Sequence, residues 1–189
     1  MRAIPAEQFR RWSLGLQRSD HDAYAALFEA TYDALFRYAW TFTRSRETSY
    51  DVLQEVYLKL WQVRARVDPS RSLRALLYQM VRNYALNQQR SDRRHRLDPL
   101  DASFYEPPSE TFESALYARD LGAQIRLWVD EMPERRREAF RLSRYEGLSH
   151  EEIARVMGLT PKTVNNHVVL ALQHLRARLR TYESTPLPS

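Results

Sequence analysis

The residues best suited to binding chemistry lie in the segment 149–167, where two helix-capping patterns enclose a glycine. Ser149 followed by Glu152 is a capping box, which predicts that a helix begins there. Gly158 suits the left-handed residue that ends a helix, and Thr160, followed by a proline, predicts the cap of a second helix. Two helices joined by so short a turn are typical of a helix-turn-helix motif.

The predicted second helix of this motif is polar at its start. Its apolar positions are Val164, Val168, Ala171 and Leu175. A helix-turn-helix places the start of this helix in the major groove, where amide, ammonium and hydroxyl groups meet base edges and phosphates. The residues expected to contact duplex DNA are Thr160, Lys162, Thr163, Asn165, Asn166 and His167. The competing interpretation is a helical hairpin in an ordinary bundle, with a polar outer face.

A second candidate nucleic-acid surface lies at the end of a predicted helix over residues 72–90. The polar side chains there belong to Asn83, Asn87, Arg90, Arg93, Arg94 and Arg96, with Tyr78 and Tyr84 nearby in the sequence. Asparagine can bond bases, arginine contacts phosphates or stacks on bases, and tyrosine adds a flat face. A solvated basic helix end is the alternative, but four arginines within residues 90–96 favour nucleic acid.

A third feature is a predicted helix over residues 47–62 with two chemically different faces. The core stripe is Leu53, Val56, Tyr57 and Leu60, and the opposite face carries Asp51, Gln54, Glu55, Leu58, Trp61 and Gln62. Acids mixed with large apolar side chains predict a partner-binding face, because tryptophan is enriched at interface hot spots. The alternative is that Trp61 folds back onto its own core.

Length and composition limit the class of protein. The chain has 189 residues, 29 basic and 24 acidic, with a net charge of +5 and no cysteine. At roughly 150 residues per domain, this length allows one domain or two small ones. The lack of cysteine excludes disulfides, thiolate nucleophiles and Cys-ligated zinc. No apolar run reaches the ~18 residues of a membrane span, and the N-terminus lacks a signal-peptide core, so we expect a cytoplasmic protein without membrane insertion.

The sequence argues against an enzyme. The side chains that could be imagined as metal ligands are His150, Glu151, Glu152, His167 and His174. They do not form an H-E-x-x-H motif, and Glu152 is better used as a helix cap. We therefore expect no catalytic residue, no metal site and no cofactor.

The elements that must position all these residues are helical. Apolar residues recur at helical spacing, and the chain has only four glycines. We expect an all-α protein with two small helical domains joined by a flexible linker, the C-terminal one a helix-turn-helix. The expected parts are an N-terminal extension of unknown role at 1–19, a helical domain at 20–96, a proline-containing linker at 97–114, a second helical domain at 115–182 and a frayed tail at 183–189.

Three stretches of the chain resemble one family. Tyr50-Asp-Val-Leu-Gln-Glu-Val-Tyr-Leu-Lys-Leu-Trp61 and Leu73-Arg-Ala-Leu-Leu-Tyr-Gln-Met-Val-Arg-Asn-Tyr-Ala-Leu-Asn87 resemble region 2 of bacterial RNA polymerase sigma factors. The segment from Met132 through Glu151-Glu-Ile-Ala154 to Leu175-Arg176 resembles their region 4. With these two regions and a short tether, the chain resembles the extracytoplasmic-function (ECF) group of the sigma-70 family, over about residues 20–96 and 120–180.

The resemblance implies a sigma factor that directs core RNA polymerase to promoters. The face with Asp51, Gln54, Glu55, Leu58 and Trp61 would dock on the clamp helices of the β′ subunit. Region 2 would open the −10 element: Asn83, Asn87, Arg90, Arg93 and Arg94 would hold the non-template strand, and the loop Val63–Arg71, with Arg64, Arg66 and Arg71, would receive a flipped base. Region 4 would read the −35 element through the six residues of the second helix.

The resemblance also implies further partners and shows departures. An apolar surface near Trp128 and Phe140 would meet the β flap, and an anti-sigma factor of unknown identity is a further expected partner. Many members of the family have tryptophan where Leu76 stands and arginine where His167 and Leu170 stand. The family gives no meaning to the first nineteen residues. A helix-turn-helix regulator that binds duplex DNA independently of polymerase is the alternative function.

Overall fold

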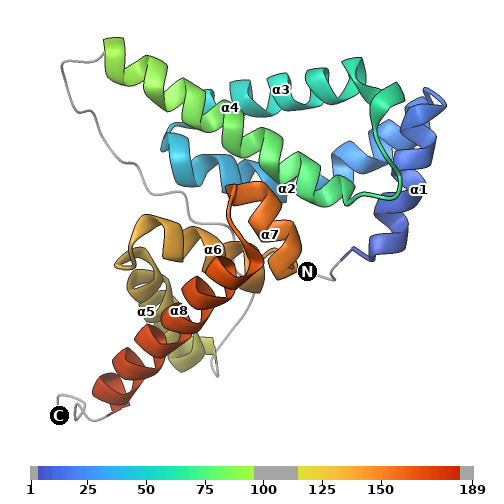
Figure 1. Ribbon diagram of the computed structural model, residues 1–189. Helices are drawn as coiled ribbons and strands as arrows, with labels where there is room; N and C mark the ends of the chain where they lie inside the picture. The colour runs from blue at the N-terminus through green and yellow to red at the C-terminus, as the bar shows by residue number, and fades with distance from the viewer. Residues whose placement is uncertain (1–3, 96–114, 184–189) are drawn as a thin grey trace. The chain divides into compact units, whose positions relative to one another are not determined.

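The computed structural model describes the backbone of residues 4–95 and 115–183 and divides the chain into two compact units, Met1–Phe104 and Tyr105–Ser189. The described residues form α-helices and one short 3-10 turn, with no strand among them (Figure 1). The expected all-α fold is confirmed. The expected linker at 97–114 and the chain after residue 183 lie outside the described residues.

The first unit begins each of its two central helices with a side-chain cap. Its described elements are α1 (Ala6–Gln17), α2 (His21–Thr43), α3 (Arg46–Gln62), η1 (Arg64–Arg66) and α4 (Leu73–His95). The Asp20 carboxylate accepts hydrogen bonds from the backbone N–H groups of Asp22 and Ala23 at the start of α2. The Ser45 hydroxyl accepts one from the Thr48 N–H at the start of α3. These bonds satisfy donors that the first helical turn leaves free.

Helices α2, α3 and α4 pack together around an apolar core. Leu27 and Leu35 from α2, Val56 and Leu60 from α3, and Val81 from α4 are each at most 1% exposed. Helix α4 is longer than the sequence predicts, because it continues to residue 95 instead of ending near residue 90. The side chains of its last five residues lie outside the described part.

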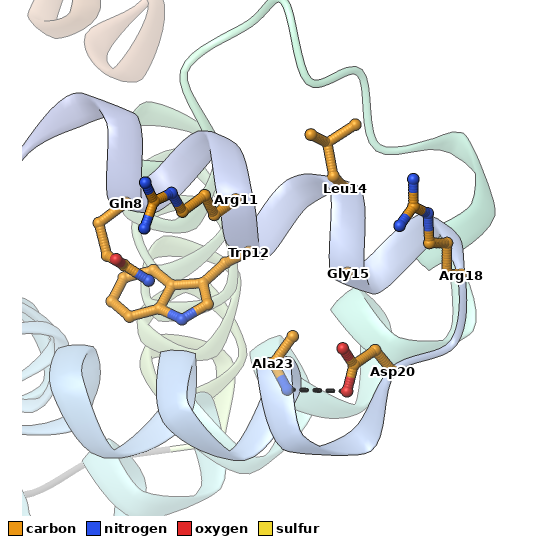
Figure 2. Close-up of a pocket in the computed structure, with 8 residues that line it drawn as sticks. All are labelled: Gln8, Arg11, Trp12, Leu14, Gly15, Arg18, Asp20 and Ala23. Atoms are coloured by element: carbon orange, nitrogen blue, oxygen red, sulfur yellow. Dashed lines mark hydrogen bonds between the residues drawn. The ribbon is translucent and has the colours of Figure 1, made fainter.

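Helix α1 packs against α2, η1 and α4. Its apolar side, with Phe9, Trp12 and Leu16, is buried. Gly15 lies where α1 comes close to α2, and a Cβ atom there would stand 2.4 Å from the Cβ of Ala23 (Figure 2). A side chain at position 15 would therefore force the two helices apart, which explains the glycine.

The second unit contains α5 (Ala115–Asp130), α6 (Glu134–Arg144), α7 (His150–Met157) and α8 (Pro161–Glu183) among its described residues. Val129, Met132, Phe140 and Ala171 form a buried cluster against which Ile125, Leu172 and Leu175 pack. Helix α8 contacts α5, α6 and α7. The sequence predicts helices at 134–145, 149–157 and 161–180, and the observed ends differ from these by at most a few residues.

Candidate nucleic-acid and partner interfaces

The helix-turn-helix formed by α7 and α8 has the caps that the sequence predicts. Ser149 Oγ accepts a bond of 3.2 Å from the Glu152 N–H, and the Glu152 carboxylate accepts one of 2.8 Å from the Ser149 N–H. Gly158 ends α7 with φ 65°. Thr160 Oγ1 accepts a bond of 3.2 Å from the Thr163 N–H at the start of α8. Because a cap holds each side of the turn, the orientation of α8 against α7 is defined by local contacts.

The first turns of α8 expose a polar surface. Lys162, Asn165 and Asn166 are exposed, whereas Thr163 and His167 are half-buried. Val164 on the other side of the helix is completely buried. The structure therefore brings the predicted −35 residues to one helix end, where Thr160 is exposed together with the ammonium group and the two amides.

Two exposed apolar residues extend this surface and were not among the sequence-predicted contacts. Val169 and Leu170 are 42% and 43% exposed. They stand four residues after Asn165 and Asn166, so each pair shares a helix face. Thymine methyl groups offer apolar contacts in the major groove. The spacing from the asparagines was the signal in the sequence that could have found them.

The end of α4 exposes the paired asparagines. Asn83, Asn87 and Arg90 are exposed, and their spacing of four and three residues places them on one face. The backbone of α4 continues through Arg93 and Arg94, whose side chains lie outside the described part, as does Arg96 altogether. The face is therefore formed by two amides and at least one guanidinium.

The prediction that Tyr78 offers a flat face to nucleic acid is wrong. Tyr78 is only 4% exposed, and its ring centroid lies 5.1 Å from that of Tyr38 in an edge-to-face contact. Five residues separate it from Asn83, which turns the two side chains about 140° apart around the helix. Tyr84 is half-buried.

The Arg64 guanidinium in the Val63–Arg71 loop is engaged within the unit. Its Nε donates a hydrogen bond of 2.9 Å to Ser19 Oγ, and its Nη1 donates one of 2.8 Å to the Trp61 carbonyl. Its Cζ also lies 4.3 Å from the Trp61 ring centroid, a cation–π contact. Arg64 therefore links the end of α3 to the turn before α2.

The other two arginines of this loop point outward. Arg66 is exposed, and the Arg71 side chain is 81% exposed, with its Nε 3.5 Å from the Asp68 carboxylate. Asp68 Oδ1 also accepts bonds from the Ser70 hydroxyl and backbone N–H, which hold the pKa of this carboxyl below its ordinary value. The second half of the loop thus carries a structured turn with an accessible guanidinium on it.

The predicted partner-binding face of α3 splits into an exposed part and a packed part. Asp51, Gln54, Glu55 and Leu58 are exposed, and Leu58 is 49% exposed despite being apolar. Trp61 is half-buried, with its ring centroid 4.6 Å from that of His21 and 5.0 Å from that of Tyr24. The structure brings four of the five side chains into the open, while the tryptophan packs on α2.

A row of contacting aromatic rings between α2 and α3 was missed in the sequence. Phe28 lies 4.7 Å from Tyr57, and Phe36 lies 4.9 Å from Tyr50, measured between ring centroids. Phe28 and Tyr50 are nonetheless 38% and 39% exposed. The Tyr57 hydroxyl lies 2.8 Å from Thr31 Oγ1, and burial raises the pKa of this tyrosine far above its ordinary value. Helical spacing alone does not separate such a half-exposed row from a core stripe.

The predicted flap-contacting surface needs a correction. Trp128 and Phe140 are each 5% exposed: Phe140 belongs to the core cluster, and the Trp128 ring makes an edge-to-face contact with Tyr182 at 5.8 Å. Both residues lie on the apolar side of their helices and hold the unit together. The exposed large apolar side chains nearest to them in sequence are Leu127 and Tyr145, each 54% exposed.

Two further findings concern metal binding and membrane spanning by the described residues. In the part of the chain that the structure describes, no three His, Cys, Asp or Glu side chains gather where they could hold a metal ion. Glu152, one of the imagined ligands, serves in the capping box. Among the described helices, none combines the length and the low polarity needed to cross a membrane.

An all-α chain with an exposed, polar recognition helix in one unit and an asparagine-arginine face in the other belongs to the class of helical DNA-binding proteins. Comparison with known families narrows this class. The profile of Sigma-70 region 2 matches residues 27–95, and that of Sigma-70 region 4 matches residues 123–175. The chain belongs to the sigma-70 family of bacterial RNA polymerase sigma factors, in its ECF group.

Curated relatives carry the same family name. The chain is 32% identical over 165 residues to the ECF RNA polymerase sigma factor SigL of Mycobacterium tuberculosis (strain H37Rv), covering 84% of this chain and 92% of SigL. It is 26% identical over 154 residues to SigE of Mycolicibacterium smegmatis, covering 80% of this chain. The chain spans only 60% of the length of that SigE.

Two solved structures share the fold. CnrH, in complex with the cytosolic domain of CnrY, matches with a TM-score of 0.64 at 22% identity, covering 92% of this chain and 98% of CnrH. The sigma factor RpoE of Bartonella quintana, in complex with the anti-sigma factor NepR, matches with a TM-score of 0.66 at 21% identity, covering 83% of this chain and 96% of RpoE. At these identities the likeness concerns the fold alone.

Proposed function

We propose that this chain is the promoter-specificity subunit of RNA polymerase for a set of two-element promoters. The first unit would recognise and melt the −10 element, and the second would bind the −35 element. The observation that carries the proposal is that the region 2 and region 4 matches each contain an exposed face suited to nucleic acid. The first unit would thereby supply a surface for single-stranded DNA, and the second unit a surface for duplex DNA.

The −35 contacts are assigned to the start of α8. Lys162 would meet a phosphate, and the exposed amides of Asn165 and Asn166 would meet base edges, since an asparagine amide pairs with adenine in two hydrogen bonds. Thr160, Thr163 and His167 lie beside them and would add contacts to the backbone or the bases. These phosphate contacts would make the affinity depend on salt.

The −10 contacts are assigned to α4 and the preceding loop. Asn83, Asn87 and Arg90 would hold the separated strand, with Arg93 and Arg94 following along the same helix. Arg66 and Arg71 would contact the flipped base or its phosphate. Removing a base from the stack costs a few kcal/mol, so the surface that receives it must offset that cost.

The polymerase contact is assigned to α3. Asp51, Gln54, Glu55 and Leu58 combine charge with an exposed apolar side chain, which suits a partner surface of basic and apolar character, and we assign this partner to the β′ clamp. Trp61, at the end of α3 and packed against His21 and Tyr24 of α2, would support this face. In the second unit, Leu127 and Tyr145 are the exposed apolar side chains nearest in sequence to Trp128 and Phe140, and the β flap contact would fall to them.

This function needs no catalytic group, metal or cofactor of its own, because the polymerase carries the chemistry. It places the chain in the cytoplasm with that enzyme. The solved relatives CnrH and RpoE were each captured with a partner, CnrY or the anti-sigma factor NepR. We extend this to an anti-sigma factor for the present chain, which would cover its DNA or polymerase surfaces until a signal releases it.

Reconstituted transcription tests the proposal. Core polymerase and the full chain are incubated with DNA from the source genome, and start sites are mapped by sequencing the transcripts. We expect starts downstream of a shared pair of elements that vanish when the chain is omitted. No transcript from any promoter would contradict the proposal, and tight sequence-specific duplex binding by the free chain would favour the independent regulator instead.

A further inference from the structure

Two hydrogen bonds connect the end of α1 to the loop assigned to the flipped base. Gln17 Nε2 donates a bond of 2.9 Å to the Val67 carbonyl. Ser19 Oγ accepts a bond of 2.9 Å from Arg64 Nε. The two loop residues stand three positions apart, so the segment that ends α1 holds the loop at two points.

This segment is itself rigidly placed. Gly15 allows α1 to approach α2 so closely that a Cβ atom would collide with Ala23 (Figure 2). The backbone N–H groups of Ser19 and Asp20 donate to the carbonyls of Leu16 and Gly15, at 2.9 and 3.0 Å. Figure 2 shows Asp20 capping the start of α2 beneath this turn. The backbone that carries Gln17 and Ser19 is therefore fixed by these contacts.

Some residues of this loop make contacts within the unit, and others are exposed to solvent. Val67 is 4% exposed, and Arg64 is held by Ser19 and by the Trp61 carbonyl and ring. Arg66 and Arg71 remain exposed. The backbone on both sides of Arg66 is thus anchored while its own side chain stays available.

We propose that Gln17 and Ser19 are positioning residues for base selection at the −10 element. Gln17 acts through the Val67 carbonyl and Ser19 through Arg64, which holds the loop instead of contacting DNA. This inference rests on the proposed function. A loop that is held at two points cannot rearrange to fit a mismatched base, so the wrong base carries a larger penalty and the preference between bases is sharper. Gln17 and Ser19 precede the region 2 match at residues 27–95, so both positioning residues lie outside that match, while the loop that they hold lies within it.

The test compares the wild type with the double variant Gln17→Ala, Ser19→Gly in reconstituted holoenzyme. Ser19 has φ 56°, a conformation that glycine adopts without strain, so Ser19→Gly removes the hydroxyl without opposing the backbone. The measured quantity is the ratio of transcripts from a promoter with the preferred base at the flipped position to transcripts from one with that base replaced. We expect this ratio to fall by about tenfold, the factor for losing two ordinary hydrogen bonds.

The matched control is Glu7→Gln, on the same helix at an exposed position where the carboxylate lies 3.9 Å from the Arg10 guanidinium. It should keep the wild-type ratio. Affinity for core polymerase and for −35 duplex should stay unchanged in all variants. If the double variant unfolds, Gln17→Ala alone should lower the ratio by about threefold.

The outcomes are distinguishable. A double variant that initiates less at both promoters but keeps the wild-type ratio would overturn the positioning role, because loss of folded protein lowers both transcripts alike. A wild-type chain that initiates but shows no preference at that base would overturn it as well. A wild-type chain that does not initiate at all would contradict the proposed function first.

Discussion

The three arginines of the Val63–Arg71 loop have the same chemistry and different surroundings. Arg64 has two internal hydrogen bonds and a ring contact, whereas Arg66 and Arg71 are exposed. A guanidinium with two of its five N–H donors engaged and its face against a ring offers less to a phosphate than one in solvent. At the scale of the residue, surroundings rather than residue type decide which arginine is available to DNA.

Asn166 provides a direct test of base reading. Replacing it with alanine should weaken binding of the holoenzyme to its −35 element by ~1–3 kcal/mol, because a bidentate amide contact is lost. Binding assays with duplexes that differ at one −35 base would show the preference reduced at one position. Gln173→Ala, exposed further along the same helix, is the control and should leave the preference unchanged. An unaltered preference in Asn166→Ala would place the recognition surface elsewhere.

Glu55 tests the polymerase face. Reversal of this exposed charge, Glu55→Lys, should weaken binding to core polymerase by roughly tenfold or more, as the loss of one close charge pair does. Competition against a labelled sigma factor would measure it. Glu29→Lys, an exposed reversal on α2, controls for the change in net charge. Unchanged affinity with unaltered helicity in Glu55→Lys would remove the assignment of this face.

Tyr57 gives the first unit a sensitivity to alkali. Burial raises the pKa of Tyr57 above its ordinary value of 10.0, so ionisation is easier in the unfolded chain than in the folded one. Its contribution to stability is therefore complete below about pH 10 and declines as the pH rises further. Tyr57→Phe should cost about 1 kcal/mol near neutral pH, through loss of the bond to Thr31, and should show a smaller alkaline decline. Urea titrations at about pH 8 and about pH 10.5 would compare the two proteins.

At the scale of the element, capping residues and helical spacing predict most of the fold. Ser149, Gly158 and Thr160 mark the helix-turn-helix because each satisfies a local backbone requirement that the sequence displays. Contacts between distant segments are not displayed in this way. The burial of Tyr78 against Tyr38, and the hydrogen bond of Gln17 to the loop 50 residues later, depend on how helices meet. The sequence predicts which residues share each candidate surface. It does not predict which of them are engaged in contacts within the unit and which are exposed.

The close contact of α1 with α2 at Gly15 yields a size-swap prediction. Gly15→Ala should destabilise this unit by ~1–3 kcal/mol, because the added methyl group meets Ala23 at 2.4 Å. Adding Ala23→Gly should recover part of the loss by making room. Gly122→Ala in α5 is the control: its methyl group would lie 3.7 Å from Nη1 of Arg126, an ordinary contact distance, and should stabilise its helix by about 0.5–1 kcal/mol. Thermal unfolding of the four proteins would measure these effects, and a tolerated Gly15→Ala would show that α1 docks loosely.

At the scale of the whole molecule, the net charge of +5 conceals an uneven distribution. The exposed face of α3 carries Asp51 and Glu55, while the exposed end of α4 carries Arg90, and the start of α8 carries Lys162. Basic surfaces suit phosphates, and the acidic one suits a basic protein partner. The small size of the chain fits this division, because each unit needs to supply only positioned surfaces.

Because the two assigned tasks fall in different compact units, their variants should act independently. Glu55 belongs to the first unit and Asn166 to the second. Combining Glu55→Lys with Asn166→Ala should reduce transcription by the product of the single effects, with a coupling free energy within about 0.5 kcal/mol. The four chains are compared at limiting core polymerase on one two-element promoter, so that binding to both partners limits the signal. A coupling well above that value would mean that polymerase docking and −35 recognition depend on a shared rearrangement of the chain, and the assignment of one task to each unit would fail.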